Sequence, residues 1–307
     1  MVLVLIHVAS GRGVSSNSFC LEWYTPRMPE LPELEVVKEV LRRRAVDRTI
    51  EGVQAIGGGS AILVRSLTQQ RLEEAVTGAR IEAIDRRGKF LIFALDPAVQ
   101  DSRLFLALNP KLSGRLQLAQ PKEKKLPKTH LIFALSNGQQ LRYVDQRTMG
   151  QLYLAADLAQ VPDYATLGPE PFDVSLEEFH ERLKPYRGEI KGVLTRGEFI
   201  AGIGNAYADE ILWAAQVHPY RKRTELTGEE IERLHAAMQS VLREAIEKVR
   251  VEMGEAIHLK PREFMAVHLK SGEPCPRCGT PISVVSANQR ITNFCRACQP
   301  GGLIKGM

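Results

Sequence analysis

Residues 28–33, with the sequence MPELPE, combine residue types that could carry out covalent chemistry. If the functional chain begins at Pro29, after removal of a methionine that precedes a small residue, Pro29 carries a free secondary amine. An α-amino group has a pKa of about 7.7 to 8.0, so part of it is unprotonated and nucleophilic near neutral pH. Glu30 and Glu33 follow as candidate proton carriers. The alternative is an ordinary helix start, because proline and glutamate both favour a first helical turn.

Four of the five cysteines form two pairs near the C-terminus, and they point to a metal. The pairs are Cys275 with Cys278 and Cys295 with Cys298, and sixteen residues separate them. This is the spacing of a zinc ribbon, in which four thiolates hold one structural Zn²⁺ and leave no position for water. Disulfide pairing is the alternative, but the pattern favours metal binding in a reducing compartment. Arg290 would lie on the hairpin that the metal folds, where it can reach a phosphate.

Three other places present basic or apolar side chains on turn-forming sequence. Lys89 follows a glycine at the head of a predicted strand, where a lysine can project from a sheet edge. Leu112 is the one apolar residue that we expect to be exposed in a first turn-rich loop, and Arg147 and Met149 lie in a second. An apolar side chain beside an arginine can wedge into a base step or fill the space left by an extruded base. Read without context, Lys89 is a surface charge and each loop is merely a turn.

The glycines at positions 202 and 204 stand just before a predicted helix. Backbone amides at such a positive helix end can meet a phosphate, and Asn205 adds a side-chain donor. A helix, two turns and another helix can grip a DNA backbone without reading bases. A tight packing turn is the alternative explanation for the glycines.

Composition permits a nucleic-acid partner without demanding one. The 307 residues carry 41 Lys and Arg against 36 Asp and Glu, a net charge of +5 with a pI near 8.9. The length suits two or three domains, and no apolar run approaches the roughly 20 residues of a membrane helix. Residues 1–27 show no sustained periodicity, so we expect a disordered leader or a segment absent from the mature protein. They lack the basic start and cleavage site of a signal peptide.

Periodicity indicates an α+β chain of three domains behind this leader. Apolar residues recur at helical spacing from 34 to about 44. Period-two runs at 80–85, 90–95, 104–108, 116–119, 131–135 and 141–144 predict a β-sandwich. Ser175 caps a helix over 176–183, and Thr227 with Glu230 forms a capping box for a helix to about Val249. We place the leader at 1–27, the sandwich domain with flanking helices at 28–155, a helix-two-turns-helix domain at 156–262 and the zinc finger at 263–302.

With these segments in place, the chain resembles the formamidopyrimidine-DNA glycosylase and endonuclease VIII family of base-excision repair enzymes over residues 28 to 300. The matching motifs occur in the family's order: 29–33, 87–89, LGPEP at 167–171, GIGN at 202–205 with YADE at 207–210, and the zinc ribbon. The first motif looks more like the formamidopyrimidine branch.

The resemblance implies a mechanism and a partner. Pro29 would attack C1′ of the damaged nucleotide and form a Schiff base, Glu30 would shuttle protons, and β and δ eliminations would then cut the strand. Lys89, Asn205 and Arg290 match phosphate-binding positions around the flipped nucleotide, and Lys89 counts with Pro29 and Glu30 among the catalytic residues. Lys191 matches another basic position near the same backbone. Glu33 would have a supporting role. The implied partner is double-stranded DNA with oxidised bases or abasic sites, bound by a monomer in the bacterial cytoplasm at the nucleoid.

Several departures from the family pattern affect substrate preference. Residues 109–112 read NPKL, so Leu112 would replace an intercalating methionine, and Met149 would replace a wedge phenylalanine beside Arg147. The segment 251–273 is shorter than the family segment that covers an extruded oxidised purine, which bears on 8-oxoguanine more than on strand cleavage. Oxidised pyrimidines are therefore an alternative substrate class. A non-catalytic damaged-DNA-binding protein is the alternative if residues 1–27 are retained, because Pro29 then has no free amine.

Overall fold

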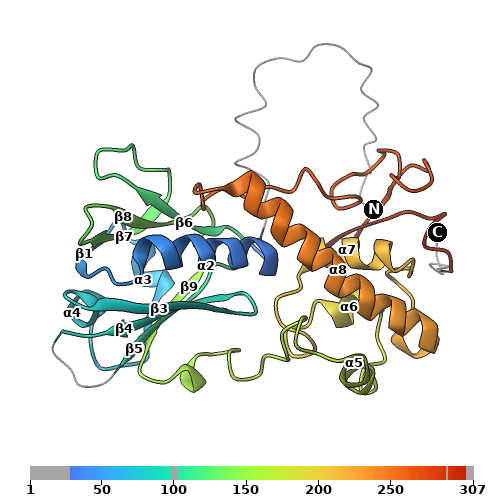
Figure 1. Cartoon of the computed structure of the whole chain (residues 1–307), viewed down its shortest axis with the longest axis horizontal. Coiled ribbons are helices and arrows are strands. Elements are labelled where there is room, and N and C mark those ends of the chain that lie inside the picture. Colours follow the sequence, from blue (N-terminus) through green and yellow to red (C-terminus); the bar gives the residue numbers. More distant parts are fainter. Residues whose placement is uncertain (1–27, 99–102, 288–289, 302–307) are drawn as a thin grey trace, which may run out of the picture.

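The computed structural model describes residues 28–98, 103–287 and 290–301, which form two lobes joined along one long helix (Figure 1). The predicted α+β class is confirmed, with a β-sandwich in one lobe and helices and a zinc ribbon in the other. The expectations for residues 1–27 lie outside the described residues. None of the helices in the described ranges is long and apolar enough to cross a membrane.

The first lobe is a sandwich of two mainly antiparallel sheets. One sheet has the order β1-β7-β8-β6, and the other has the order β2-β9-β5-β4-β3, with β2 and β9 parallel. The strands are β1 (Ile50–Ala55), β2 (Val64–Ser66), β3 (Arg80–Arg87), β4 (Phe90–Asp96), β5 (Leu104–Asn109), β6 (Gly114–Ala119), β7 (Thr129–Leu135), β8 (Gln140–Asp145) and β9 (Gln151–Ala155). The six predicted runs are confirmed. The named predictions missed β1, β2 and β9; the first two are edge strands with little burial to produce an alternating pattern.

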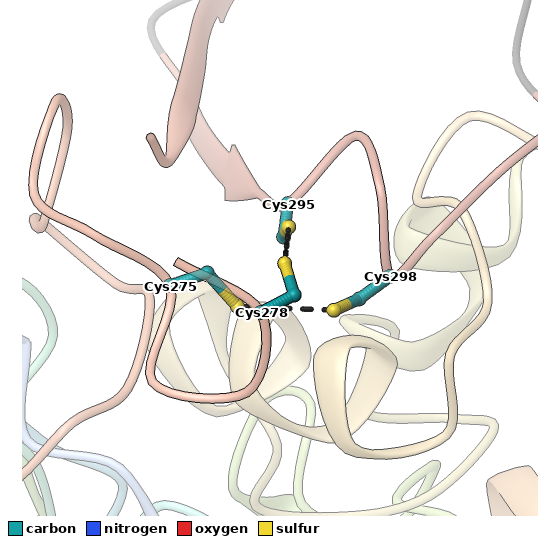
Figure 2. Close-up of side chains that lie close together, drawn as sticks. All are labelled: Cys275, Cys278, Cys295 and Cys298. Carbon is teal, nitrogen blue, oxygen red and sulfur yellow. Dashed lines mark hydrogen bonds between the residues drawn. The ribbon is translucent and has the colours of Figure 1, made fainter. Parts of the chain in front are cut away.

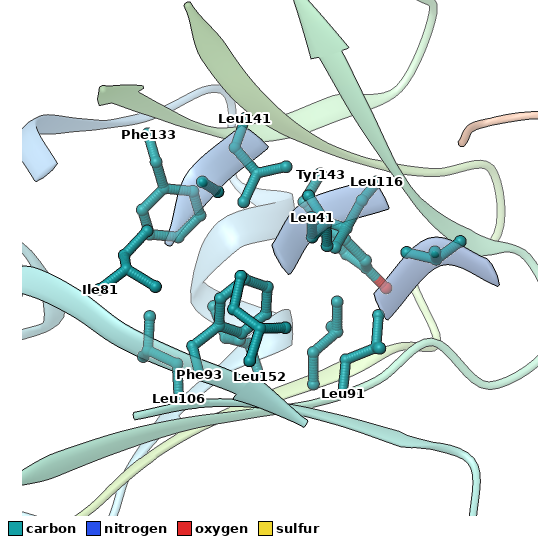
Figure 3. Close-up of a cluster of buried hydrophobic side chains, with 14 of the residues drawn as sticks. Leu41, Ile81, Leu91, Phe93, Leu106, Leu116, Phe133, Leu141, Tyr143 and Leu152 are labelled. Atoms are coloured by element: carbon teal, nitrogen blue, oxygen red, sulfur yellow. The ribbon is translucent and has the colours of Figure 1, made fainter. Parts of the chain in front are cut away.

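Helix α2 (Leu31–Ala45) packs its apolar side into the sandwich, as its helical spacing predicted. Pro32 lies in the first turn, and Glu30 and Glu33 form a capping box in place of the usual serine or threonine. Leu41 of this helix belongs to a core that side chains from both sheets fill, among them Phe93 and Phe133 (Figure 3). Of the short helices, α3 (Gly59–Leu63) lies against β2 and β7, and α4 (Leu72–Val76) lies against β1. The anchored α2 fixes where Pro29 and Glu30 can lie.

The second lobe is helical, as predicted. It contains α5 (Leu176–Leu183), α6 (Ile190–Leu194), α7 (Asn205–Ala214) and α8 (Gly228–Met253), with 3₁₀ turns η1 (Leu158–Gln160) and η2 (Arg223–Glu225). Ser175 and Thr227 cap α5 and α8 as expected. Leu234 and Met238 of α8 pack among the helices, whereas Val249 and Met253 pack in the sandwich core. Because α8 belongs to both cores, the domain borders at 155 and 262 stay a prediction.

The zinc-ribbon hairpin consists of β10 (Ser283–Ala287) and β11 (Arg290–Phe294), paired antiparallel. Strand β11 lies against α7, and the side chain of Asn293 is almost fully buried there. The ribbon hairpin is therefore held against the helix that begins at the GIGN motif.

Candidate active site and zinc centre

Glu30 lies at the positive end of α7, so the site joins the two lobes. Its carboxylate accepts hydrogen bonds from the backbone amides of Gly204 at 2.7 Å, Ala206 at 3.0 Å and Tyr207 at 3.3 Å. The side chain is buried, with 1% of its surface exposed. The expectation that these amides are free to meet a phosphate is wrong, because a carboxylate of the protein itself occupies the helix end.

Two glycines allow this close approach. A Cβ on Gly204 would lie 2.3 Å from Cδ of Glu30, and a Cβ on Gly202 would lie 2.9 Å from Cβ of Leu31. Gly202 also has a φ of +90°, a backbone conformation that residues with a side chain rarely adopt. The Gly-x-Gly sequence is thus a packing requirement of the proline-glutamate segment.

Arg262 is a site residue that sequence reasoning missed. It is 5% exposed, and its Nε donates to Glu33 Oε1 at 3.0 Å, which also accepts from the hydroxyl of Tyr207 at 3.0 Å. Burial alone would raise the pKa of Glu33, but the charge and hydrogen bond of Arg262 outweigh it and hold that pKa below its usual value. Arg262 also donates to the carbonyl of Met28. Arg262 and Glu33 are 229 positions apart in the sequence, so no local motif predicts their hydrogen bond.

Lys89 lies in the turn between β3 and β4, and Glu170 fixes that turn. Glu170 Oε1 accepts from the backbone amide of Gly88 at 2.6 Å and from Arg87 at 3.0 Å, and its Oε2 lies 2.7 Å from Arg86. The LGPEP motif therefore holds the Lys89 turn against the helical lobe. Burial lowers the pKa of Lys89 below its ordinary 10.5, and the charge of Glu30 partly opposes this.

Pro29 is buried and lines a pocket that it shares with Glu33, Pro110, Arg115 and Lys260. Burial and the nearby positive charge of Arg115 lower the pKa of Lys260 from 10.5 to about 7. No motif points to Lys260, because it lies in the segment between α8 and the ribbon, where the sequence shows none. The pocket brings two basic side chains, Arg115 and Lys260, to the predicted nucleophile.

Lys191 does not extend toward the outside of the protein, as a phosphate contact would need. It is 6% exposed, and its Nζ lies 2.6 Å from Oδ1 of Asp209. The same ammonium donates to the carbonyl of Ile291 and the hydroxyl of Thr292, both at 2.9 Å. It ties α6 and α7 to β11. The sequence could identify the charge but not its burial.

Asn205 and Arg290 come from adjacent elements. Asn205 begins α7, and its Nδ2 donates to the carbonyl of Ile291 at 2.8 Å. Arg290 begins β11, where its backbone pairs with Ala287 as the predicted hairpin required. The side chain of Arg290 lies outside what the structure describes. The fold therefore brings both backbone positions to one edge of the helical lobe.

The wedge candidates lie on two neighbouring loops of the sandwich. Leu112, in the β5–β6 loop, is half-buried rather than exposed as expected. Met149, in the β8–β9 loop, is 48% exposed, and Arg147 of that loop is also exposed. Ser113 and Asp145 connect the loops through hydrogen bonds.

The four predicted cysteines converge to one centre (Figure 2). Their sulfur atoms all lie within 4.8 Å of one another, with 3.8 Å between Cys275 and Cys298 and 3.5 Å between Cys278 and Cys295. Tetrahedral coordination with Zn–S bonds of about 2.3 Å needs sulfurs roughly 3.8 Å apart. The cluster therefore fits one structural zinc ion. Trp213 of α7 donates to the sulfur of Cys275 at 3.4 Å, which joins the centre to the helical lobe.

The comparisons with known proteins agree with this architecture. Three family models match in order: the formamidopyrimidine-DNA glycosylase N-terminal domain over 28–152, its H2TH domain over 167–254, and a zinc finger found in FPG and IleRS over 272–301. The formamidopyrimidine-DNA glycosylase of Symbiobacterium thermophilum is 36% identical over 282 residues, covering 89% of this chain and 90% of that protein.

Two solved structures of Lactococcus lactis Fpg each align over their full length with 89% of this chain. A complex with abasic-site DNA has a TM-score of 0.78 and 30% identity. A complex of a variant with Fapy-dG containing DNA has a TM-score of 0.77 and 31% identity. The sandwich, the helical lobe and the ribbon thus define a helix-two-turns-helix protein with a zinc finger. Within that class, the chain belongs to the formamidopyrimidine-DNA glycosylase family.

Proposed function

We propose that this protein is a base-excision repair DNA glycosylase with abasic-site lyase activity, and that Pro29 is its nucleophile. Family membership supports the class of activity. The observation that carries the assignment of residues is the fixed position of Glu30, which three backbone amides hold directly after Pro29. Lys89 lies close enough to Glu30 for the charge of that carboxylate to offset part of the fall in pKa that burial causes.

The chemistry follows from a free amine on Pro29. Its lone pair attacks C1′, the bond from C1′ to the base breaks, and the departing base takes the proton that the Pro29 nitrogen loses. Glu30 passes a proton to the sugar ring oxygen as the ring opens, which leaves an iminium between Pro29 and C1′. Glu30, now a carboxylate, takes a proton from C2′, and the C3′–O bond to the 3′ phosphate breaks. Loss of a C4′ proton to the same carboxylate, after it has passed the first proton to water, then breaks the C5′–O bond to the 5′ phosphate. Water then releases the sugar fragment from the amine.

DNA contacts are assigned to the edge between the lobes. We assign phosphate contacts to Lys89, Asn205 and Arg290, and insertion into the opened base pair to Leu112, Arg147 and Met149. Extrusion of the nucleotide is required because C1′ is inaccessible to a protein amine inside a stacked duplex. Lys191 supports DNA binding indirectly, because its contacts with Asp209 and with the backbone at Ile291 hold the strand that begins with Arg290.

The substrate class is duplex DNA carrying oxidised purines, first formamidopyrimidines and then 8-oxoguanine. The two Lactococcus lactis complexes contain abasic-site DNA and Fapy-dG containing DNA. The short segment between α8 and the ribbon favours testing oxidised pyrimidines as the second candidate, because a purine-covering loop has less chain available. We further propose that the protein acts as a monomer in the cytoplasm.

Borohydride trapping tests the nucleophile. Protein beginning at Met28 and processed to Pro29 is compared with protein that retains residues 1–27, on duplexes carrying an abasic site, a formamidopyrimidine, 8-oxoguanine or an oxidised pyrimidine. A covalent adduct that maps to Pro29 and forms only with the short protein is the expected result. Tight binding without an adduct on any of these duplexes would instead identify a non-catalytic damaged-DNA-binding protein.

A further inference from the structure

Asp145, the last residue of β8, organises the loop that follows it. Its Oδ2 accepts hydrogen bonds from the backbone amides of Met149 at 3.0 Å and Gly150 at 2.7 Å, and its Oδ1 accepts from the amide of Arg147 at 3.2 Å. Asp145 is fully buried. One carboxylate therefore fixes the backbone on which the two exposed side chains, Arg147 and Met149, are carried.

The neighbouring loop is attached to the same carboxylate. The hydroxyl of Ser113 donates to Oδ1 of Asp145, and the Ser113 oxygen accepts from the amide of Arg147 at 3.0 Å. Ser113 is 7% exposed and directly follows Leu112. The side chain of Ser113 thus links the loop of Leu112 to the loop of Arg147 and Met149.

The surroundings leave this carboxylate little freedom to move. The hydroxyl of Tyr143 donates to Oδ2 of Asp145 at 3.2 Å. A Cβ on Gly150 would lie 1.7 Å from that hydroxyl and 3.1 Å from Oδ2, and a Cβ on Gly114 would lie 2.2 Å from the same hydroxyl. Both loops therefore end on glycines that pack against the tyrosine at the centre of the network.

We propose that Asp145 and Ser113 are positioning residues that hold Leu112, Arg147 and Met149 as one pre-formed unit for insertion into the opened base pair. The proposal rests on the proposed function, because it assigns the unit to duplex DNA. Its physical basis is pre-organisation: loops fixed before binding lose less conformational freedom when they enter the helix. A carboxylate suits this role because both of its oxygens accept hydrogen bonds. Five donors point at them: the backbone amides of Arg147, Met149 and Gly150 and the hydroxyls of Ser113 and Tyr143.

The test separates insertion from chemistry. Ser113→Ala removes the link between the loops and leaves the bonds from Asp145 to its own loop. Asp145→Asn replaces one accepting oxygen with a donor that faces other donors. Ser136→Ala is the matched control, because Ser136 accepts one backbone hydrogen bond, from Thr49 at 3.1 Å, in the distant β7–β8 turn.

The first readout needs no catalysis. 2-Aminopurine placed opposite a tetrahydrofuran site in a duplex reports unstacking when the protein inserts. We expect Ser113→Ala to raise the protein concentration that gives half of the maximal fluorescence change by about ten-fold, which corresponds to the loss of one hydrogen bond to a charged group. Asp145→Asn should lower it further, and Ser136→Ala should match the wild type.

The second readout compares substrates. Schiff-base trapping on a single-stranded abasic oligonucleotide requires no base pair to be opened, so both variants should trap as the wild type does, while excision from duplex DNA slows. Unchanged insertion in folded Ser113→Ala and Asp145→Asn proteins would overturn the proposal, and so would an equal loss on single-stranded and duplex DNA. Absence of trapping by the wild type would refute the proposed function alone, since the fluorescence readout still tests positioning.

Discussion

Replacing Gly204 with alanine tests how the helical lobe positions the proton carrier. The backbone at Gly204 has φ −121° and ψ −162°, which alanine adopts without strain. The new Cβ would lie 2.3 Å from Cδ, 2.5 Å from Oε1 and 2.6 Å from Oε2 of Glu30. Ordinary contacts between carbon atoms are about 3.5 to 4.0 Å, so the carboxylate must move by about 1 Å or more.

This displacement has two expected costs. The carboxylate loses its fit to three backbone amides, and one hydrogen bond to a charged group contributes about 1.5 to 3 kcal/mol, so we expect stability to fall by roughly 3 kcal/mol. Misplacing a catalytic group by about 1 Å slows chemistry on the order of 100-fold. Single-turnover excision of a formamidopyrimidine lesion measures the rate, and chemical denaturation measures the stability.

Gly192→Ala is the matched control for this substitution. Gly192 lies in α6, and a Cβ there would meet no atom within 4 Å. Alanine in a helix is favoured over glycine by up to about 1 kcal/mol, so this variant should keep its activity and be at least as stable as the wild type. A Gly204→Ala protein that excises within about three-fold of the wild-type rate would refute the assignment of Glu30 to the proton transfer or its fixed position.

Three further predictions concern buried charge and the metal. Arg262→Met should lower stability at pH 7 by about 3 to 5 kcal/mol, since it leaves Glu33 buried without its charged partner. Because Arg262 lowers the pKa of Glu33, the difference in stability between wild type and variant should shrink as pH falls through that pKa, and a constant difference on acidification would contradict the ion pair. Lys260→Met should stabilise the protein most below pH 7, because the lowered pKa of about 7 means that protonating Lys260 costs free energy in the folded state. This gain in stability should decline as pH rises from 7 toward 10.5, and chemical denaturation at several pH values measures it. Strong chelators should release one zinc ion per chain and abolish binding to tetrahydrofuran DNA while the sandwich keeps its β-sheet circular dichroism, and Cys278→Ser should do the same; full binding by metal-free protein would contradict a structural role for the zinc.

Local sequence was sufficient for the features whose physics is local. The zinc centre follows from four cysteines at fixed spacing, because thiolate pairs separated by two residues can close on one ion wherever the hairpin lies. The caps of α5 and α8 follow from Ser175 and Thr227, whose side chains bond amides only three residues away. Alternating apolar residues likewise predicted the main strands, since one face of each strand must be buried.

Only the tertiary structure decided which groups surround the candidate nucleophile. Glu30 accepts a hydrogen bond from the amide of Gly204, 174 positions away, so the backbone amides that we expected to bind a phosphate bind a carboxylate of the protein instead. The resemblance to the family made Lys191 a candidate DNA contact, but its burial against Asp209 is not visible in the sequence. Arg262 lay in a segment without a motif. The physical reason is the same in each case: residue type fixes what a side chain can bond, whereas packing of distant elements fixes what it does bond and how much water remains around it.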